Sequence, residues 1–306
     1  MIKKYTSQNV TWIDMEEPDK KEVKSLMTEY RIHPLVADEL LVSTFKPSVD
    51  LYDNFIYLIL HFPAFRHSYN ETGNYNREVD FIIGKDFLIT AHYGNVNPLH
   101  EPSKAFEIET ILNNDKQIEH AGYLFYRVAQ QLYKSLIKEL DYIENIQEDL
   151  EKDIFGGNEK QMVKEISRVN HNLLDFKQAM SHHKETLDSL EIIGSEFFGK
   201  DFSYYLKDIS NKYRKVSHII DTNMENLKEL RRTNDSLLTT KQNETMKIFT
   251  IMAFVTFPLS LIASIFGMNA TFIPIIGTKG DFWVIIGGMI VVTGLMFWYF
   301  KHKKWF

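Results

Sequence analysis

Only a few side chains in this sequence have the types and spacing that chemistry at a site would need. The nearest to a metal-binding group is the cluster of His182, His183 and Glu185, whose side-chain types bind transition metals. Neighbouring residues of a helix point about 100° apart, so two adjacent histidines cannot converge on one ion. The pattern therefore favours a polar helix surface over a metal site.

The signatures of enzyme chemistry are missing from the sequence. It contains no glycine-rich phosphate loop, no nucleophile elbow and no HExxH pair. It also contains no cysteine, which excludes disulfides, thiolate catalysis and zinc-finger or iron–sulfur ligation. A formal net charge of -6, from 35 basic and 41 acidic residues, argues against a nucleic-acid-binding protein. We therefore expect a protein that is not an enzyme, carries no cofactor and binds no nucleic acid.

An acidic stretch is the remaining group of charged side chains that could act on an ion. Carboxylates gathered along a helix raise the local concentration of cations, but runs of this kind are more often solvated helix faces. Both interpretations of the stretch stay open. Its members are Glu139, Asp141, Glu144, Glu148, Asp149, Glu151 and Asp153.

Two uncharged runs near the C-terminal end are the strongest structural signal. They cover residues 248–266 and 282–300, and a helix needs about 20 apolar residues to cross a bilayer. We therefore predict two membrane spans, with the lipid bilayer as a partner. The tail after the second span is rich in lysine, whereas the segment between the spans carries only Lys279 and Asp281 as charged residues. Basic residues stay on the cytoplasmic side, so both termini are expected in the cytoplasm of a cell-membrane protein.

Residues 1 to about 115 predict a small domain of mixed helices and strands. Short runs of branched and aromatic residues indicate strands, and periodic apolar positions indicate helices between them. Pro18 suits the first position of a helix, and His33-Pro34 is expected to close that helix and open another through Leu41. The expected strands are residues 11–14, 55–62, 79–83 and 87–91.

After residue 117 the strand signals vanish and the sequence becomes helical. We expect helices near 117–154 and 159–196, and a third that begins near Asp201 and continues into the first span. Apolar residues on the third helix recur at intervals of three and four, with two asparagines among them, which makes a heptad seam. A helix so long cannot fold around itself, so the seam predicts packing against copies of the same helix in other chains. The seam consists of Leu206, Ile209, Tyr213, Val216, Ile220, Asn223, Leu227, Leu230, Asn234 and Leu237.

The first span ends in Phe266-Gly267-Met268-Asn269, just before the segment that joins the two spans. This sequence at this position resembles the signature of the CorA family of divalent-cation channels, in which an aromatic residue precedes Gly-Met-Asn. Other segments resemble the family in the same order, so the resemblance covers nearly the whole chain. They are Trp12-Ile13-Asp14, His33-Pro34-Leu35, Lys46-Pro47 followed by Tyr52, Asn243-Glu244-Thr245-Met246-Lys247, Phe257-Pro258-Leu259-Ser260 and the basic tail 301–306.

The resemblance implies an α+β membrane protein that forms a funnel-shaped homopentamer. Its N-terminal part would be a cytoplasmic α/β/α domain, followed by helices that lead through a coiled-coil stalk into a pore. The implied divisions are the α/β domain at 1–115, a helical hairpin at 116–200, the stalk helix at 201–247, the pore-lining first transmembrane helix at 248–266, an external loop at 267–281, the second transmembrane helix at 282–300 and a basic cytoplasmic tail at 301–306.

The resemblance also implies a channel or transporter that brings Mg2+ into the cytoplasm, with Co2+ and Ni2+ as further ions. A ring of Asn269 amides, supported by Gly267 and Met268, would select the hydrated ion through its waters, because Mg2+ loses water reluctantly. The side chains implied to line the pore below this ring are Asn243, Met246, Phe249, Ala253, Phe257 and Ser260. Among them, Met246 and Phe249 would form a hydrophobic gate.

A regulatory metal site is implied as well. Family members hold a divalent cation between neighbouring cytoplasmic domains, and this cation closes the pore when internal Mg2+ is plentiful. The matching acids here are Asp38 and Glu39, after the His-Pro-Leu segment, and Asp208 from the neighbouring chain. A solvated helix face is the alternative interpretation of these three acids.

The segment after the motif departs from the pattern of magnesium transporters, which commonly continue with Met-Pro-Glu-Leu. Here residues 270–277 contain the proline but no carboxylate. This departure keeps a Zn2+ transporter of the ZntB type open as an alternative. A second alternative is a membrane-anchored coiled-coil scaffold or sensor that conducts no ion.

Overall fold

The structure is a computed structural model of the 306-residue chain. It describes residues 2–6, 9–44, 46–63, 76–93, 120–268 and 280–303. The chain divides into two compact units, Met1–Arg231 and Arg232–Phe306, and each is described by itself.

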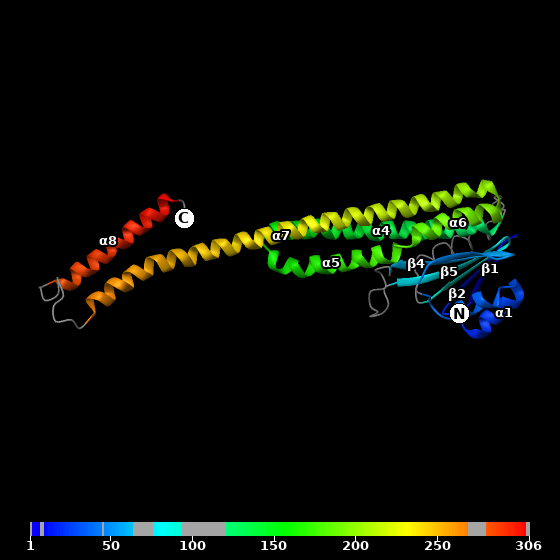
Figure 1. Ribbon diagram of the computed structural model, residues 1–306, viewed down its shortest axis with the longest axis horizontal. Coiled ribbons are helices and arrows are strands. Elements are labelled where there is room, and N and C mark those ends of the chain that lie inside the picture. The colour runs from blue at the N-terminus through cyan, green and yellow to red at the C-terminus, as the bar shows by residue number, and fades with distance from the viewer. Residues whose placement is uncertain are drawn as a thin grey trace. The chain divides into compact units, whose positions relative to one another are not determined.

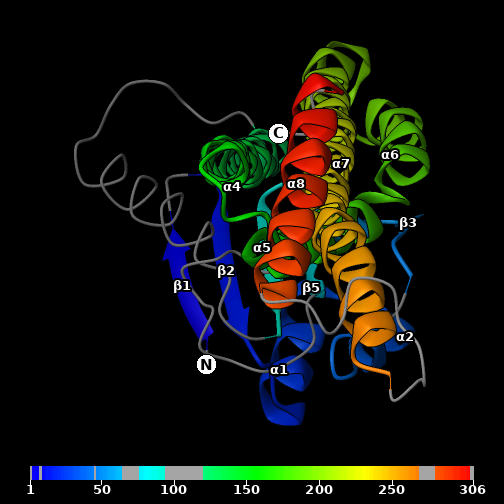
Figure 2. The same ribbon diagram turned by 90° about the vertical axis from the view of Figure 1, so that its left-hand side faces the viewer.

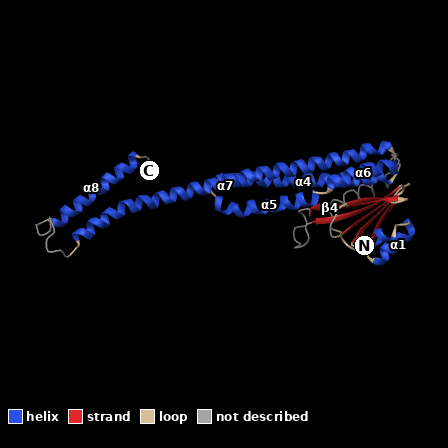
Figure 3. Cartoon of the chain, viewed as in Figure 1, coloured by secondary structure: helices blue, strands red, loops and turns tan. Residues whose placement is uncertain are grey.

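The first unit is built on a six-stranded sheet with the strand order β1-β2-β6-β5-β4-β3. Its strands are β1 (Ile2–Thr6), β2 (Thr11–Glu16), β3 (Ser48–Leu51), β4 (Phe55–Pro63), β5 (Asn76–Gly84) and β6 (Phe87–His92). Neighbouring strands are antiparallel except β2 and β6, which are parallel. The two edge strands, β1 and β3, were not predicted, because they are short and half-exposed and lack a run of apolar residues. Figure 3 shows the described strands together in this unit.

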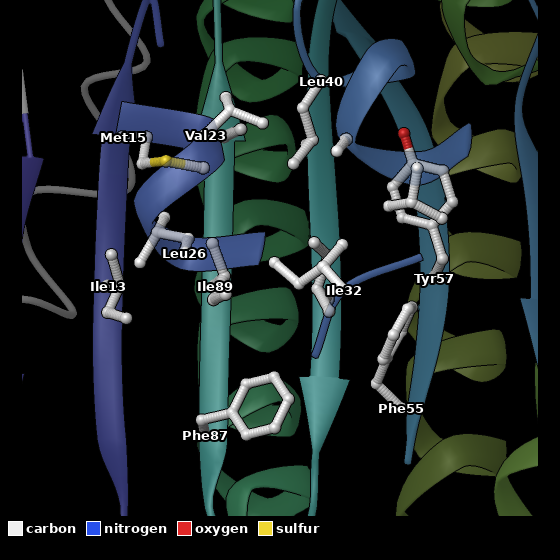
Figure 4. Packing of buried hydrophobic residues seen from close by; sticks show 14 of the residues in the cluster. Ile13, Met15, Val23, Leu26, Ile32, Leu40, Phe55, Tyr57, Phe87 and Ile89 are labelled. Carbon is white, nitrogen blue, oxygen red and sulfur yellow. The ribbon is translucent and has the colours of Figure 1, made fainter. Parts of the chain in front are cut away.

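Helices cover both faces of the sheet, which explains why every residue of β4 is buried. On one face, α1 (Lys20–Tyr30) and α2 (Pro34–Glu39) pack against β2, β4 and β6. Figure 4 shows this core, where Val23 and Leu26 of α1 meet Ile13 and Ile89 of the sheet. On the other face, the ring of Phe81 contacts Phe125 of the first long helix at 5.3 Å between ring centroids. The sheet and the helices that follow it in sequence therefore share one folded unit.

The start of α1 differs from the sequence prediction. Asp19 is the N-cap, and its carboxylate accepts hydrogen bonds of 2.7 Å from the backbone nitrogens of Lys21 and Glu22. The side chain of Glu22 accepts in return from the backbone nitrogen of Asp19, which completes a capping box. The prediction that Pro18 occupies the first helical position is thus wrong, because the aspartate provides the stronger helix start. Pro34, by contrast, stands at the first position of α2.

The helices after the sheet are α4 (Ala121–Phe155), α5 (Glu159–Met180), α6 (His183–Phe198), a short 3-10 helix η2 (Lys200–Phe202), α7 (Ser203–Phe266) and α8 (Asp281–His302). The single helix expected over 159–196 is therefore two helices, with a break at Ser181 and His182. Buried residues lie directly on both sides of the break, at Met180 and His183. Figure 1 shows α5 and α6 as separate helices, and each buries one face.

The heptad seam of α7 is buried within its own chain. Leu206, Ile209, Val216 and Ile220 are almost fully buried. In Figure 2, α7 lies between α4 and α6. A side chain in place of Gly194 on α6 would overlap Leu206, so these two helices are in close contact.

Polar contacts also tie the seam face of α7 to the neighbouring helices. Gln147 of α4 donates to the backbone carbonyl of Asn223 at 3.0 Å, and Lys177 of α5 forms an ion pair with Asp221 at 2.9 Å. The prediction that the seam packs against copies in other chains is therefore wrong for the stretch through Leu227, because α4, α5 and α6 already cover it.

The second unit contains the C-terminal part of α7 and the whole of α8. Both helices contain a stretch that is long and apolar enough to span a membrane. The rest of the chain buries only 6% of this stretch in α7 and 0% of it in α8. A core helix of a soluble protein would be covered by the rest of the chain, so these exposed apolar helices fit a bilayer instead.

Candidate functional site

The Gly-Met-Asn motif lies where α7 ends. The backbone nitrogen of Gly267 donates to the carbonyl of Ala263 at 2.9 Å, and that of Met268 donates to Ile265 at 3.4 Å. A Cβ on Gly267 would lie 3.0 Å from the Ala263 carbonyl oxygen, so glycine suits this tight helix end. Both Gly267 and Met268 are exposed. Asn269 lies outside the described residues.

The candidate pore residues form one exposed stripe on α7. Their spacing of three and four places them within an arc of about 120° around the helix. All six are exposed, and the large apolar side chains of Met246, Phe249 and Phe257 are 62%, 58% and 74% exposed. The stripe is polar at both ends and apolar in the middle. It consists of Asn243, Met246, Phe249, Ala253, Phe257 and Ser260.

The acids Asp38 and Glu39 lie on the outer face of α2. The helix begins with His33 as N-cap, whose Nδ1 accepts from the backbone nitrogen of Leu35 at 3.3 Å. Val36 and Ala37 are buried against the sheet. Because the next two residues of a helix turn away from that buried face, both carboxylates are exposed.

A buried carboxylate anchors the connection that follows α2. Glu78 of β5 accepts hydrogen bonds from the hydroxyl of Ser43 and the backbone nitrogen of Thr44, each at 2.6 Å. Burial raises the pKa of Glu78, but hydrogen bonds from His61, Ser43 and Thr44 outweigh this effect and hold the pKa below its usual value. Glu78 is therefore an ionised anchor for residues only a few positions after Glu39.

A second buried acid lies close to the other end of the same connection. The hydroxyl of Tyr93 donates to the backbone carbonyl of Leu40 at 2.9 Å and lies 3.4 Å from Asp80 Oδ2. Burial, reinforced by the nearby charge of Glu78, raises the pKa of Asp80 well above its usual value. Hydrogen bonds thus hold both ends of the segment after α2, so the position of α2 and its two acids is fixed relative to the sheet.

Asp208, the third candidate acid, lies on α7 and already has partners in its own chain. Its Oδ2 accepts from the hydroxyl of Tyr126 at 2.8 Å and lies 3.5 Å from Gln130 Nε2. The ammonium group of Lys212 lies 3.5 Å from the same oxygen. Burial and the hydrogen bond to Asp208 raise the pKa of Tyr126 to about 12, so its hydroxyl remains a donor.

Sequence reasoning missed these partners of Asp208. Tyr126 is 82 positions away in sequence and meets the carboxylate only through the packing of α4 on α7. The contact between Lys212 and Asp208 could have been predicted from the sequence, since residues four apart on a helix are neighbours.

Within a single chain, the three acids do not assemble into a metal site. The described part of the chain contains no group of three or more His, Asp or Glu side chains that could hold a metal ion. The acidic stretch on α4 is exposed apart from half-buried Glu139, as a solvated helix face would be.

His183 is fully buried, so the expected polar surface is wrong at this position. Its Nδ1 lies 2.8 Å from the hydroxyl of Tyr133, and its Nε2 lies 2.7 Å from the backbone carbonyl of His61. A carbonyl can only accept, so Nε2 carries the proton and Nδ1 accepts from the tyrosine. Burial lowers the pKa of His183 to about 4, which keeps the ring neutral. The residue joins the sheet to the helices and is not available to a metal.

The chain is similar to known transport proteins along nearly its whole length. The cobalt/magnesium transport protein CorA of Thermotoga maritima is 26% identical over 302 residues, covering 98% of this chain and 84% of the relative. The complete structure of the CorA magnesium transporter from Methanocaldococcus jannaschii matches with a TM-score of 0.84 at 19% identity, covering 99% of this chain and 93% of that chain. At this identity the structural match shows the fold alone, and that fold includes the α/β domain, the long helix and the two apolar C-terminal helices.

The cytoplasmic domain of ZntB from Vibrio parahaemolyticus is also similar in fold. It matches with a TM-score of 0.62 at 15% identity, covering 76% of this chain and 89% of that chain. The zinc alternative is not favoured, because the relative that covers 98% of this chain is a cobalt/magnesium transport protein and the matching sequence profile is one of Mg2+ transporters. A sequence profile described as CorA-like Mg2+ transporter protein matches residues 7–302. The chain therefore belongs to the CorA-like Mg2+ transporter protein family.

Proposed function

We propose that this chain is one subunit of a homopentameric channel or transporter that moves Mg2+ into the cytoplasm, with Co2+ and Ni2+ as further substrates. The names of the relatives support the choice of Mg2+ and Co2+, since they are described as magnesium and cobalt transporters. The family is one of transporters, so the expectation that the chain is not an enzyme is confirmed. The observation that carries the proposal is the exposed stripe on α7 that leads to the Gly-Met-Asn motif.

The stripe supports a pore because it leads to the Gly-Met-Asn motif and its large apolar side chains, like others on this part of α7, have no cover in the second unit. Met246, Phe249 and Phe257 are more than half exposed. If several copies of α7 surround an axis, these side chains face each other around a narrow apolar passage. Such a passage closes by losing its water, which is a simple gate for a hydrated ion.

Ion selection is assigned to the Gly-Met-Asn motif at the C-terminal end of α7. Mg2+ holds its waters strongly and prefers oxygen ligands in octahedral geometry. Neutral side-chain amides of Asn269, one from each subunit, would bind those waters without stripping them. Gly267 keeps the helix end narrow, since a side chain there would press on the Ala263 carbonyl. Met268 has no oxygen ligand to offer and is given a shaping role.

Feedback is assigned to Asp38 and Glu39 of one subunit and Asp208 of the next. Asp38 and Glu39 are exposed on α2, and the described residues of one chain contain no group of three His, Asp or Glu side chains that could hold a metal ion. Both observations are consistent with a site that needs two subunits. A cation between the acids draws the subunits together, and its loss leaves like charges that repel. The proposed orientation places both termini in the cytoplasm, because lysines lie in the last turn of α8 and after it.

Ion flux into proteoliposomes tests the proposal. Purified protein should carry Mg2+ and Co2+ inward, with weaker or no uptake of Zn2+. Asn269→Ala should abolish uptake while the oligomer keeps its size on gel filtration. Thr293→Ala on α8 is the matched control, because it removes a polar side chain outside the stripe, and it should transport normally. Unchanged flux in the Asn269 variant would contradict the assigned selection site, and absence of flux for every ion would contradict transport.

A further inference from the structure

The carboxylate of Asp208 is held asymmetrically. All three of its side-chain partners contact one oxygen, Oδ2, at 2.8 Å from Tyr126, 3.5 Å from Gln130 and 3.5 Å from Lys212. The other oxygen, Oδ1, has no hydrogen bond or ion pair to any described side chain. One oxygen is thus occupied by its own chain, and the other is available to an incoming ion.

The partners of Asp208 differ in charge, and this difference decides what each can do. Tyr126 and Gln130 are neutral, and Gln130 also donates to the Tyr126 hydroxyl at 2.7 Å. The Tyr126 ring packs on Tyr205 at 5.1 Å, which fixes the hydroxyl in place. These two side chains orient the carboxylate without cancelling its charge. Lys212 is the charged partner, and it places a positive charge beside the same carboxylate.

We propose that Lys212 competes with the divalent cation for Asp208 and so sets the Mg2+ concentration at which the sensing site fills. This inference rests on the proposed role of Asp208 in feedback. A divalent cation at Asp208 would stand beside the ammonium group, and two positive charges at this separation repel each other. An ion at Oδ1 therefore weakens the contact of Lys212 with Oδ2 or displaces it, and this cost lowers the affinity for the ion.

The spacing of Asp208 and Lys212 on α7 and their partial burial strengthen this competition. Lys212 follows Asp208 by four residues on α7, so the two side chains are neighbours whenever the helix is intact. Their side chains are 32% and 34% exposed, so water screens the pair less than it screens a pair on an open surface. The ammonium group of Lys212 therefore stays close to Asp208 whether or not an ion is bound, because both residues belong to the same helix.

The test is the Mg2+ dependence of protease protection in the full-length protein. Chymotrypsin is the suitable protease, because it does not cut at lysine and so treats the lysine variants alike. Lys212→Gln should lower the Mg2+ concentration for half protection by roughly two- to fivefold, in keeping with the modest strength of a partly exposed ion pair. Lys212→Arg keeps the charge and should restore a midpoint close to that of the unchanged protein.

Lys215→Gln is the matched control for net charge. Lys215 lies on the same helix and is exposed. Its substitution removes one positive charge without removing the ion pair to Asp208, so its midpoint should stay near that of the unchanged protein. If Lys215→Gln shifts the midpoint as far as Lys212→Gln does, the effect is one of general charge and the proposal is overturned. An unchanged midpoint in Lys212→Gln overturns it as well.

A further variant separates this inference from the function on which it rests. Asp208→Asn should raise the midpoint strongly or abolish protection, and adding Lys212→Gln to it should cause no further shift. If Asp208→Asn leaves protection unchanged, the feedback role of Asp208 is wrong. If Asp208→Asn acts as expected but Lys212→Gln does not, the feedback role stands and only the competition by Lys212 is wrong.

Discussion

The backbone nitrogen of Thr44 lies 2.6 Å from Glu78 Oε2, which joins the segment after α2 to the middle of the sheet. Glu78 is almost completely buried, and its other carboxylate oxygen accepts from the hydroxyl of Thr44 at 3.2 Å. A buried carboxylate is costly unless donors surround it. The hydrogen bonds from Ser43 and Thr44 offset the cost of burying Glu78. They also fix the position of the chain just beyond Asp38 and Glu39.

Replacing Glu78 by glutamine should destabilise the first unit. The new amide group turns a donor toward Ser43 or Thr44, so at least one of the hydrogen bonds that these residues donate to the buried carboxylate is lost. We expect a loss of about 2 kcal/mol in the free energy of unfolding. Denaturant unfolding followed by tryptophan fluorescence measures it. Asp50→Asn, which neutralises an exposed carboxylate on β3, is the control, and equal stabilities of the two variants would contradict the anchoring role.

The stability of the protein should fall in acid because of His183. Its pKa is about 4 in the folded state against 6.5 for a free histidine, so the unfolded chain takes up the proton first as the pH falls. The contribution of the neutral ring is complete above pH 6.5 and is lost progressively toward pH 4, by at most about 3 kcal/mol. Unfolding midpoints measured between pH 7.5 and 4 should fall less steeply in His183→Gln.

The neighbouring residue His182 provides the control for this pH dependence. It is exposed, so His182→Gln should follow the same pH profile as the unchanged protein. If the slope persists in His183→Gln, another group causes the acid sensitivity.

The packing of the α7 seam within one chain predicts how a seam mutation affects the stability of the protein and the mass of the proposed oligomer. Ile209 is fully buried, so Ile209→Ala leaves a cavity and should cost about 2–4 kcal/mol of stability. Because the seam faces helices of the same chain, the mass of the assembled oligomer should not change in light-scattering measurements. Ile192→Ala, at a residue that is 70% exposed, should alter neither quantity. A smaller oligomer in the Ile209 variant would show that the seam joins subunits.

The gate assigned to the stripe on α7 predicts a leaky variant. Phe249→Ala removes a large apolar side chain from the proposed constriction, which should let water persist there and raise flux several-fold. Flux should also respond less to internal Mg2+. Ile248→Ala removes an equally exposed apolar side chain that points about 100° away from Phe249, outside the stripe, and should transport normally. Equal flux in the two variants would contradict a gate at Phe249.

The sequence predicted those parts of the fold that depend on long or strongly apolar segments. The run that forms β4 was recognised because both of its faces are buried, and the ends of α7 and α8 follow from uncharged stretches. The edge strands β1 and β3 were missed because a half-exposed strand has no such run. The break between α5 and α6 was missed because no glycine or proline marks it.

The candidate site was likewise predicted only in part. Asp208 could be named from its place in the chain, but its contact with Tyr126 depends on how two helices pack, which no local pattern encodes. The burial of His183 has the same cause, since its partners come from β4 and α4. Pairwise contacts between distant segments therefore had to come from the structure.

The buried seam of α7 has a consequence for the order of assembly. Because α4, α5 and α6 cover Leu206, Ile209 and Val216, a newly made subunit of the proposed oligomer can complete this core alone. Subunits that fold first and associate afterwards keep the apolar residues of this seam covered before they meet other copies. The step that requires other copies is then confined to the surfaces that remain open, and these include the exposed stripe that leads to Gly267.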